Sequence, residues 1–556
     1  MSPERDDKII PFSRFRADVG KGGAQRLREL LNSRDVTAAV QALDPLELFA
    51  LAQDVGEGDA IDVVALASDE QVKRVIDLGI GSSSAPDLRY IERWLAAAIA
   101  HGHGTATLLF EKLDEDLQTL YLFRRLKVYD ARDENWPDDD VERLVTPDGT
   151  FVLEVMDDEE PSELDESLPT AANDVPANDN KPFSPLRLIA DLYSVDWQRA
   201  DTMMRDAKWA IAAELEETVV RLRDARLEEL GFPPRDDAFK LFSRRGPAAQ
   251  LKAREGHTAV RHTLPVTYAE PFFADSFFVR VMNAVQDVEL VGELENELIY
   301  AVNATCVFEE RVYSETDSVR AAGRDVRNWI SLGLEVLSAG DPEAAAALVR
   351  KHPLRELLSL GVEQSHKLAD WVRKAESEGL FRLPGLSRRP LNADDERFLK
   401  ALLGRIPRFV EGPAGEPARA FASRQDLAHA QKRIEGLARQ MLALRFVARA
   451  AADYAVSLQA CEPDIHAVTV DLLLRSALLR ATLGASLKDT FGVSPADLRA
   501  FHAVVSKDAA LPDLEPPPEV VATLHEVWAA LVRDVLAAGV EAEPQYLNLI
   551  VRKEQG

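Results

Sequence analysis

Apolar residues recur at spacings of three and four along most of the chain, the pattern of one buried face on an α-helix. Gly231 can adopt the left-handed conformation that closes a helix, and Pro233 and Pro234 cannot continue one. The apolar stripe that leads to this stop consists of Met204, Ala207, Ile211, Leu215, Val219 and Leu222. The pattern predicts one helix over 197–230 and a mainly α-helical protein.

Other segments repeat this pattern. Further helices are expected at about 184–193, 235–243, 272–290, 292–312, 316–338, 342–351, 354–379, 393–404, 423–460, 464–490, 495–506 and 517–539. Near the N-terminus three helix starts resemble one another: Asp44 precedes a proline, Ser68 opens a capping box with Gln71, and Asp114 begins the third. Helices that restart this often after short turns predict a helical bundle or superhelical stack.

Two stretches depart from the helical pattern. The tight-turn sequence Thr146-Pro147-Asp148-Gly149 lies between Val- and Phe-containing runs and predicts a small β-hairpin over 141–156. The acidic, Pro- and Asn-rich stretch 157–182 predicts a disordered linker. The predicted organisation is a mobile N-terminus 1–23, a helical domain 24–156 that includes the hairpin, the linker 157–182, a helical domain 183–410, a connector 411–422 and a C-terminal helical subdomain 423–556.

Charge narrows the classes of function. The formal net charge of the 556 residues is −28, and residues 130–166 hold 16 acidic against two basic side chains, a local balance of −14. This sign repels phosphate backbones, so we expect no nucleic-acid partner. The acidic segment fits a self-repelling linker; the alternatives are a docking tail for a basic partner and a weak site for divalent cations.

Hydropathy and cysteine content indicate the compartment. No stretch approaches the roughly 18 to 20 uninterrupted apolar residues that a membrane span needs, so we expect no membrane span. Cys306 and Cys461 are the only cysteines, which favours a reducing, cytoplasmic setting.

The chain shows no convincing catalytic motif. His101 and His103, each followed by glycine, are interpreted as residues at a helix end rather than metal ligands. Cys306 is expected to be a buried structural thiol. Glu293, Glu295 and Glu297 alternate, so on a helix we expect them to diverge instead of converging on one substrate. We therefore predict no metal and no cofactor.

Two resemblances follow from short segments. The restarts Ala42-Leu43-Asp44-Pro45-Leu46-Glu47-Leu48 and Lys112-Leu113-Asp114-Glu115-Asp116-Leu117 are similar to the N-terminal superhelical domain of bacterial MgtE-type magnesium transporters. The segments 223–232, 296–303 and 332–335 make the chain resemble an uncharacterised bacterial family of cytoplasmic helical proteins, a domain of unknown function. That family implies a helical fold but no activity.

The leading hypothesis is a cytoplasmic helical scaffold or protein-interaction protein with a protein partner. The alternatives are an enzyme, for example a hydrolase, with a cleft between the C-terminal helices, and a regulator that responds to divalent cations. Arg226, Glu229, Gly231 and Phe232 are the candidate interaction residues; the alternative is that they form a helix end packed in the core.

Overall fold

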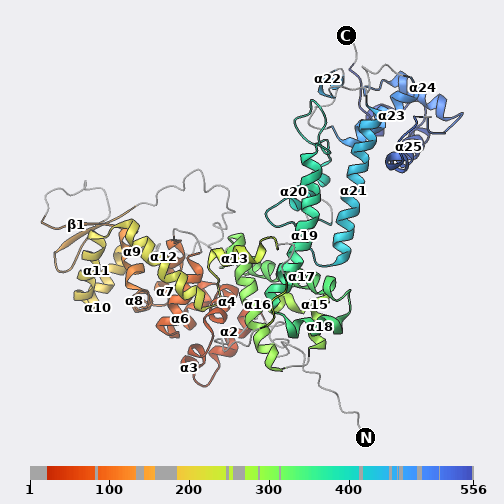
Figure 1. The fold of residues 1–556 in the computed structure, drawn as a ribbon. Helices are drawn as coiled ribbons and strands as arrows, with labels where there is room; N and C mark the ends of the chain where they lie inside the picture. Colours follow the sequence, from red (N-terminus) through yellow and green to blue (C-terminus); the bar gives the residue numbers. More distant parts are fainter. Residues whose placement is uncertain are drawn as a thin grey trace, which may run out of the picture. The chain divides into compact units, whose positions relative to one another are not determined.

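A computed structural model describes residues 22–553 of the chain, except 82–85, 133–142, 157–183, 246–249, 255–268, 286–287, 312, 314, 412–416, 450–453, 460, 462–467, 485–490 and 513. The predicted linker 157–182 lies outside the described residues, as do 1–21 of the predicted mobile N-terminus and 412–416 of the predicted connector. The described part is mainly helical with one small antiparallel sheet, which confirms the predicted fold class (Figure 1).

The chain divides into two compact units. The first comprises residues up to Ser243, Gln250–Arg327 and Gly340–Leu357, and the second comprises Arg244–Ala249, Asn328–Ala339 and the residues from Leu358 onward. Up to Lys351 the elements are α2 (Gly23–Leu31), α3 (Val36–Gln41), α4 (Pro45–Val55), α5 (Glu57–Leu66), α6 (Asp69–Gly79), α7 (Leu88–His101), α8 (His103–Glu111), α9 (Glu115–Arg125), β1 (Leu126–Asp130), β2 (Arg143–Val145), β3 (Phe151–Val155), α10 (Pro185–Val195), α11 (Trp197–Trp209), α12 (Ala212–Glu229), α13 (Arg235–Phe242), η1 (Glu270–Phe273), α15 (Phe277–Ala284), α16 (Val288–Glu309), α17 (Thr316–Leu337) and α18 (Pro342–Lys351).

Helix starts in the first unit follow the predicted capping signals in two of three cases. Asp44 accepts a hydrogen bond from the Leu46 amide (2.9 Å), and Ser68 and Gln71 form the capping box. Asp114 also precedes its helix, α9, but its side chain caps no amide because the carboxylate pairs with Arg226 instead (2.6 Å). Local sequence therefore set the position of the third start but not the role of its side chain.

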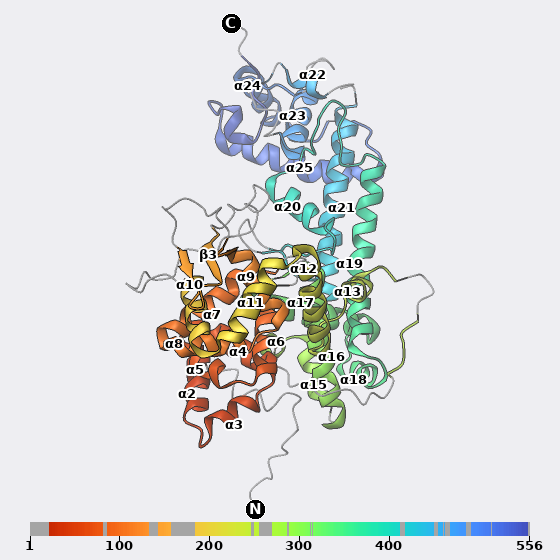
Figure 2. The same cartoon turned by 90° about the vertical axis from the view of Figure 1, so that its left-hand side faces the viewer.

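The predicted hairpin is part of a three-stranded antiparallel sheet. β2 and β3 pair around the predicted turn, with Val145 opposite Val152, and β1 adds a strand on the other side of β3 in the order β1-β3-β2. α11 packs against β1 and α10 against β3. The sheet is thus covered by helices that follow the acidic segment in sequence (Figure 2).

The single helix predicted over 197–230 is wrong: α11 ends at Trp209 and α12 begins at Ala212. The backbone is extended at Ala210 (ψ 144°), and Ile211, predicted to be apolar core, is 60% exposed. Both helices pack against α9, but α11 also contacts β1 whereas α12 also contacts α6. A continuous apolar period could not reveal this change of direction.

The second unit contains α19 from Leu358 onward and the elements that follow it. These elements are α19 (Leu354–Ser377), α20 (Ala393–Leu402), α21 (Arg424–Val447), α22 (Tyr454–Leu458), α23 (Val470–Thr482), α24 (Pro495–Val505), α25 (Pro518–Ala538) and η3 (Pro544–Leu547). α21 packs against α23 and α25, around a core that includes Phe398, Phe421, Phe491 and Trp528.

The predicted domain boundaries stay predictions, because they concern which segments fold independently. The helices that follow the predicted linker in sequence nonetheless pack against elements that precede it. α10, α11 and α12 contact α8, α9, β1 and β3. Over the described ranges, every helix is too short or too polar to cross a membrane.

Candidate interaction groove

A groove lies between α19 and α21 in the second unit. The two helices run side by side in both views (Figures 1 and 2), and a hollow of about 290 Å³ opens between them. It is lined by Gln364, Lys367, Leu368 and Trp371 of α19 and by Leu427, Gln431, Ile434 and Glu435 of α21. These eight residues are called the α19–α21 groove below.

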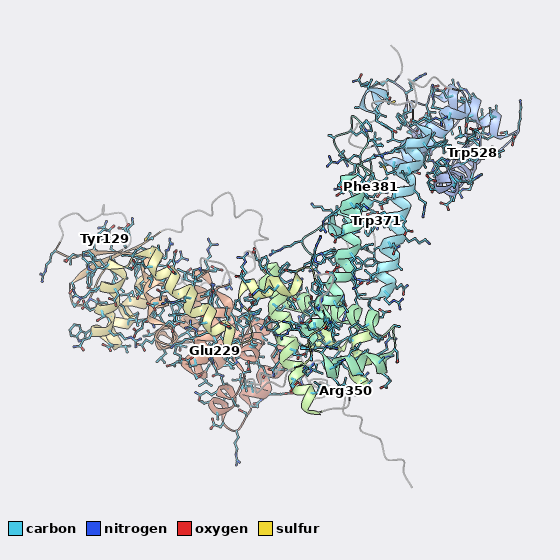
Figure 3. The ribbon with its side chains drawn as sticks, in the orientation of Figure 1. Tyr129, Glu229, Arg350, Trp371, Phe381 and Trp528 are labelled. Carbon is cyan, nitrogen blue, oxygen red and sulfur yellow. The ribbon has the colours of Figure 1, made fainter. Side chains whose placement is uncertain are left out.

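The groove forms because α19 is apolar over more of its circumference than the core covers. Val362, Ala369 and Val372 are fully buried on one face. Leu368 and Trp371 each precede a buried residue by one position, so they lie beside that face rather than on it. Trp371 remains 42% exposed, and Figure 3 labels it between α19 and α21.

One face of α21 forms the other wall. Leu427, Gln431, Ile434, Ala438 and Leu442 recur at spacings of four and three, which places them in one row along the helix. Ile434 is fully buried at the floor, whereas Leu442 is 37% exposed. The row therefore continues past the groove for about 12 Å, the length of eight helical residues.

The polar groups of the groove suit binding better than catalysis. Among the described residues that line it, Glu435 is the single carboxylate and Lys367 the single amine, and Ser, Cys and His do not occur. Glu435 accepts a hydrogen bond from Gln431 (2.8 Å) and lies 4.0 Å from Arg439. Nucleophilic catalysis would need a nucleophile next to a base, whereas an apolar floor with polar edges is typical of a recognition site.

The predicted interaction residue Arg226 holds the first unit together. Its guanidinium makes a two-point contact with Asp77 (2.5 and 2.9 Å) and a third contact with Asp114 (2.6 Å). Asp77 is buried, and burial raises the pKa of its carboxyl above the ordinary value, although the hydrogen bond and charge of Arg226 act in the opposite direction. Arg226 thus joins α12 to α6 and to the start of α9.

The other three predicted interaction residues lie at the end of α12. Gly231 has φ +83°, and Phe232 is buried with its ring centroid 4.8 Å from that of Tyr313. Glu229 is exposed and pairs with Arg74 (2.8 Å). Gly231 and Phe232 therefore fit the alternative that the sequence left open, a helix end packed in the core. A role of the four residues in binding stays a prediction.

A second polar cluster closes around Arg254. Glu293 and Glu297 both contact its guanidinium (3.4 and 2.5 Å), so two of the three alternating glutamates share a helix face, whereas divergence of all three was expected; their convergence on a substrate stays untested. They are four residues apart and share a helix face, which the alternation concealed. Burial raises the pKa of Glu297, despite the opposing charge of Arg254.

The groups of this cluster are already engaged with one another. Glu297 also accepts a hydrogen bond from the Leu354 amide (2.7 Å). Arg254 donates hydrogen bonds to the carbonyl oxygens of Val349 and His352 (2.9 and 3.1 Å). His352 in turn contacts the carbonyl of Lys252 through Nδ1 (2.7 Å). These contacts bind the segment around Arg254 to the end of α18. The cluster therefore has a structural role.

His101 and Cys306 show no sign of metal binding or nucleophilic activity in the described part of the chain. His101 ends α7, as predicted, but His103 begins α8, so only one of the pair lies at a helix C-terminus. Cys306 is fully buried, and burial raises the pKa of its thiol to about 12. Within the described ranges no group of three or more His, Cys, Asp or Glu side chains could hold a metal ion; Asp138–Asp140 lie outside these ranges.

Sequence reasoning missed the groove, although Trp371 carried a signal. It lies outside the buried row of α19 and has Lys367 four residues before it and Lys374 three residues after it. Tryptophan is enriched among the residues that dominate protein interfaces, so a tryptophan off the buried row of a helix is a candidate contact for a partner. The facing row of α21 is more than 50 residues away in sequence, so the signal could not indicate a groove.

Comparison with known proteins gives a family but no activity. The model of a family described as "Family of unknown function (DUF6178)" matches residues 4–542. Neither the curated proteins nor the solved structures include a match to the chain.

Proposed function

We propose that this chain, which belongs to the family of unknown function DUF6178, is a scaffold or interaction protein that binds a helix of a protein partner in the α19–α21 groove. The observation that carries the proposal is the partly exposed Trp371 beside the apolar floor of that groove. Tryptophan is among the residues that most often dominate the energy of protein interfaces, because its large apolar surface becomes desolvated on binding.

The shape of the site supports a helical partner segment. Two helices that lie side by side leave a furrow, and a third helix can pack into it with side chains spaced at i, i+3, i+4 and i+7. Leu368, Trp371 and Leu427 supply apolar contacts at the mouth, and Leu442 extends them along α21. The polar groups of Gln364 and Gln431 border the same contacts.

The alternative of an enzyme with a cleft between the C-terminal helices is less well supported. The α19–α21 groove is such a cleft, but the lining described above offers one carboxylate and one amine and no nucleophile beside a base. Regulation by divalent cations would depend on the acidic segment, most of which lies outside the described residues, and it stays a separate prediction.

A cytoplasmic location is part of the proposal. Cys306 and Cys461 are both free and buried, which suits a reducing compartment. The likeness of the N-terminal restarts to the MgtE-type superhelical domain stays a prediction about the fold of that region.

Site-specific photo-cross-linking tests the proposal. A benzophenone amino acid replaces Gln431, an exposed residue that lines the groove, and in a control it replaces Ser377, an exposed residue of α19 outside the groove. Irradiation in the native host should join a partner protein to the chain only from position 431, and peptide sequencing should locate the cross-link in a helical segment of the partner. Equal products from both positions, or none from position 431, would contradict the proposal.

A further inference from the structure

The helix that carries Trp371 also carries exposed cations on either side of it. Lys367 precedes Trp371 by four residues and lines the α19–α21 groove, and Lys374 follows by three; both are exposed. At these spacings the three side chains are neighbours on the helix surface. A segment that covers Trp371 therefore meets an ammonium group on each side of the indole.

Four carboxylates near the groove already have cationic neighbours. Asp370 is paired with Arg244 (2.5 Å) and Arg373 (3.0 Å), and Glu376 with Arg389 (3.0 Å). On the facing helix, Glu435 has Arg439 as a neighbour, and Asp426 is paired with Arg419 (2.7 Å). Among the described residues neither Lys367 nor Lys374 forms an ion pair, and the carboxylates at the nearest helical spacing to them outside these pairs are Glu363 and Glu378.

The sign of this region is opposite to that of the whole chain. Residues 361–377 of α19 and 424–447 of α21 contain eight Lys or Arg and five Asp or Glu, a balance of +3. The chain as a whole carries −28. The residues that line the groove include one lysine and one glutamate, so the positive balance belongs to the two helices as a whole. Helices of net positive charge on an acidic protein favour approach of a negatively charged partner segment and disfavour a basic one.

We infer that the helix received by the α19–α21 groove is acidic along the flanks of its apolar ridge. The inference rests on the proposed function and adds the chemistry of the partner. The row from Leu427 to Leu442 spans 15 residue steps, about 22 Å, so a partner helix of about 16 residues would cover it. Its apolar ridge packs on Trp371 and Leu442, and its carboxylates face Lys367 and Lys374.

Two designed peptides of about 16 residues test the charge. Both are helical and share one leucine ridge, but the flanking positions are Glu in one and Lys in the other. Fluorescence anisotropy with the full chain at low salt should show the Glu peptide binding about tenfold more tightly, and the difference should shrink as salt rises.

Paired charge reversals supply the matched control. In the variant Lys367→Glu with Lys374→Glu the preference should disappear or reverse. In the variant Lys400→Glu with Lys507→Glu, two exposed lysines of the same unit outside the groove, the preference should persist at an identical change in net charge. All four side chains are exposed, so both variants should fold.

The outcomes separate this inference from the proposed function. Equal affinity for the two peptides, with both lost in Trp371→Ala, would overturn the acidic preference and leave the groove as a helix-binding site. A preference that survives reversal of Lys367 and Lys374 would also overturn it. If neither peptide binds, the inference fails, whereas the proposed function is decided by cross-linking at position 431.

Discussion

Asp77 is a buried carboxylate whose main cationic partner comes from far along the chain. Arg226, 149 residues later, makes the two-point contact with it. Replacement Arg226→Ala should lower the free energy of unfolding by about 3 kcal/mol, because it leaves a buried acid without its partner. Urea unfolding followed by circular dichroism measures this change. In the control Glu229→Ala, at an exposed pair, the change should stay within about 0.5 kcal/mol; similar effects of the two variants would contradict the structural role of Arg226.

The raised pKa of Asp77 also predicts a dependence of stability on pH. The unfolded carboxyl releases its proton near its ordinary pKa of 3.8, whereas burial keeps the folded one protonated to higher pH. Between these two pKa values the folded state binds more protons, so the contribution of Asp77 to stability falls as pH rises and is constant above that window. Unfolding at a series of pH values should show a shallower fall in Asp77→Asn; parallel profiles for the two proteins would contradict the assignment.

Helices α17 and α19 approach closely at one glycine. A β-carbon on Gly361 would lie 2.0 Å from the carbonyl oxygen of Trp329, so any side chain forces the backbones apart. Gly361→Ala should therefore destabilise the second unit by about 3 kcal/mol. Gly436→Ala in α21 is the matched control, since nothing lies within 4 Å of its β-carbon position, and it should stabilise by about 0.5 to 1 kcal/mol. Thermal melts compare them, and equal melting temperatures would show that the two helices do not approach this closely.

At the scale of elements, helix caps and turns could be predicted from the sequence, but the direction in which one helix follows another could not. The caps at Asp44 and Ser68, the hairpin turn at 146–149 and the helical class follow from residues within a few positions of one another. The break at Ala210 depends instead on where α11 and α12 find partners. The ion pair of Arg226 with Asp77 joins distant segments, as the α19–α21 groove does, and a single sequence has no period that links such segments.

At the scale of the whole molecule, charge is divided by region. The segment 130–166 carries half of the net negative charge, while the helices that form the α19–α21 groove are locally basic. The acidic segment is visible in the sequence as a run of like charges. The basic region becomes apparent only when α19 and α21 lie side by side. This division supports a protein that attracts an acidic partner segment at one defined place.

The central claim is that a protein partner binds over Trp371, and a matched pair of substitutions tests it most directly. Trp371→Ala and Tyr546→Ala each remove an exposed aromatic side chain from the second unit, but only Trp371 lies in the groove. With the partner identified by cross-linking, calorimetric titration should show affinity at least about 30-fold weaker for Trp371→Ala, the effect typical of an interface hot spot, and unchanged affinity for Tyr546→Ala. Equal affinity of Trp371→Ala and the natural chain would contradict the claim.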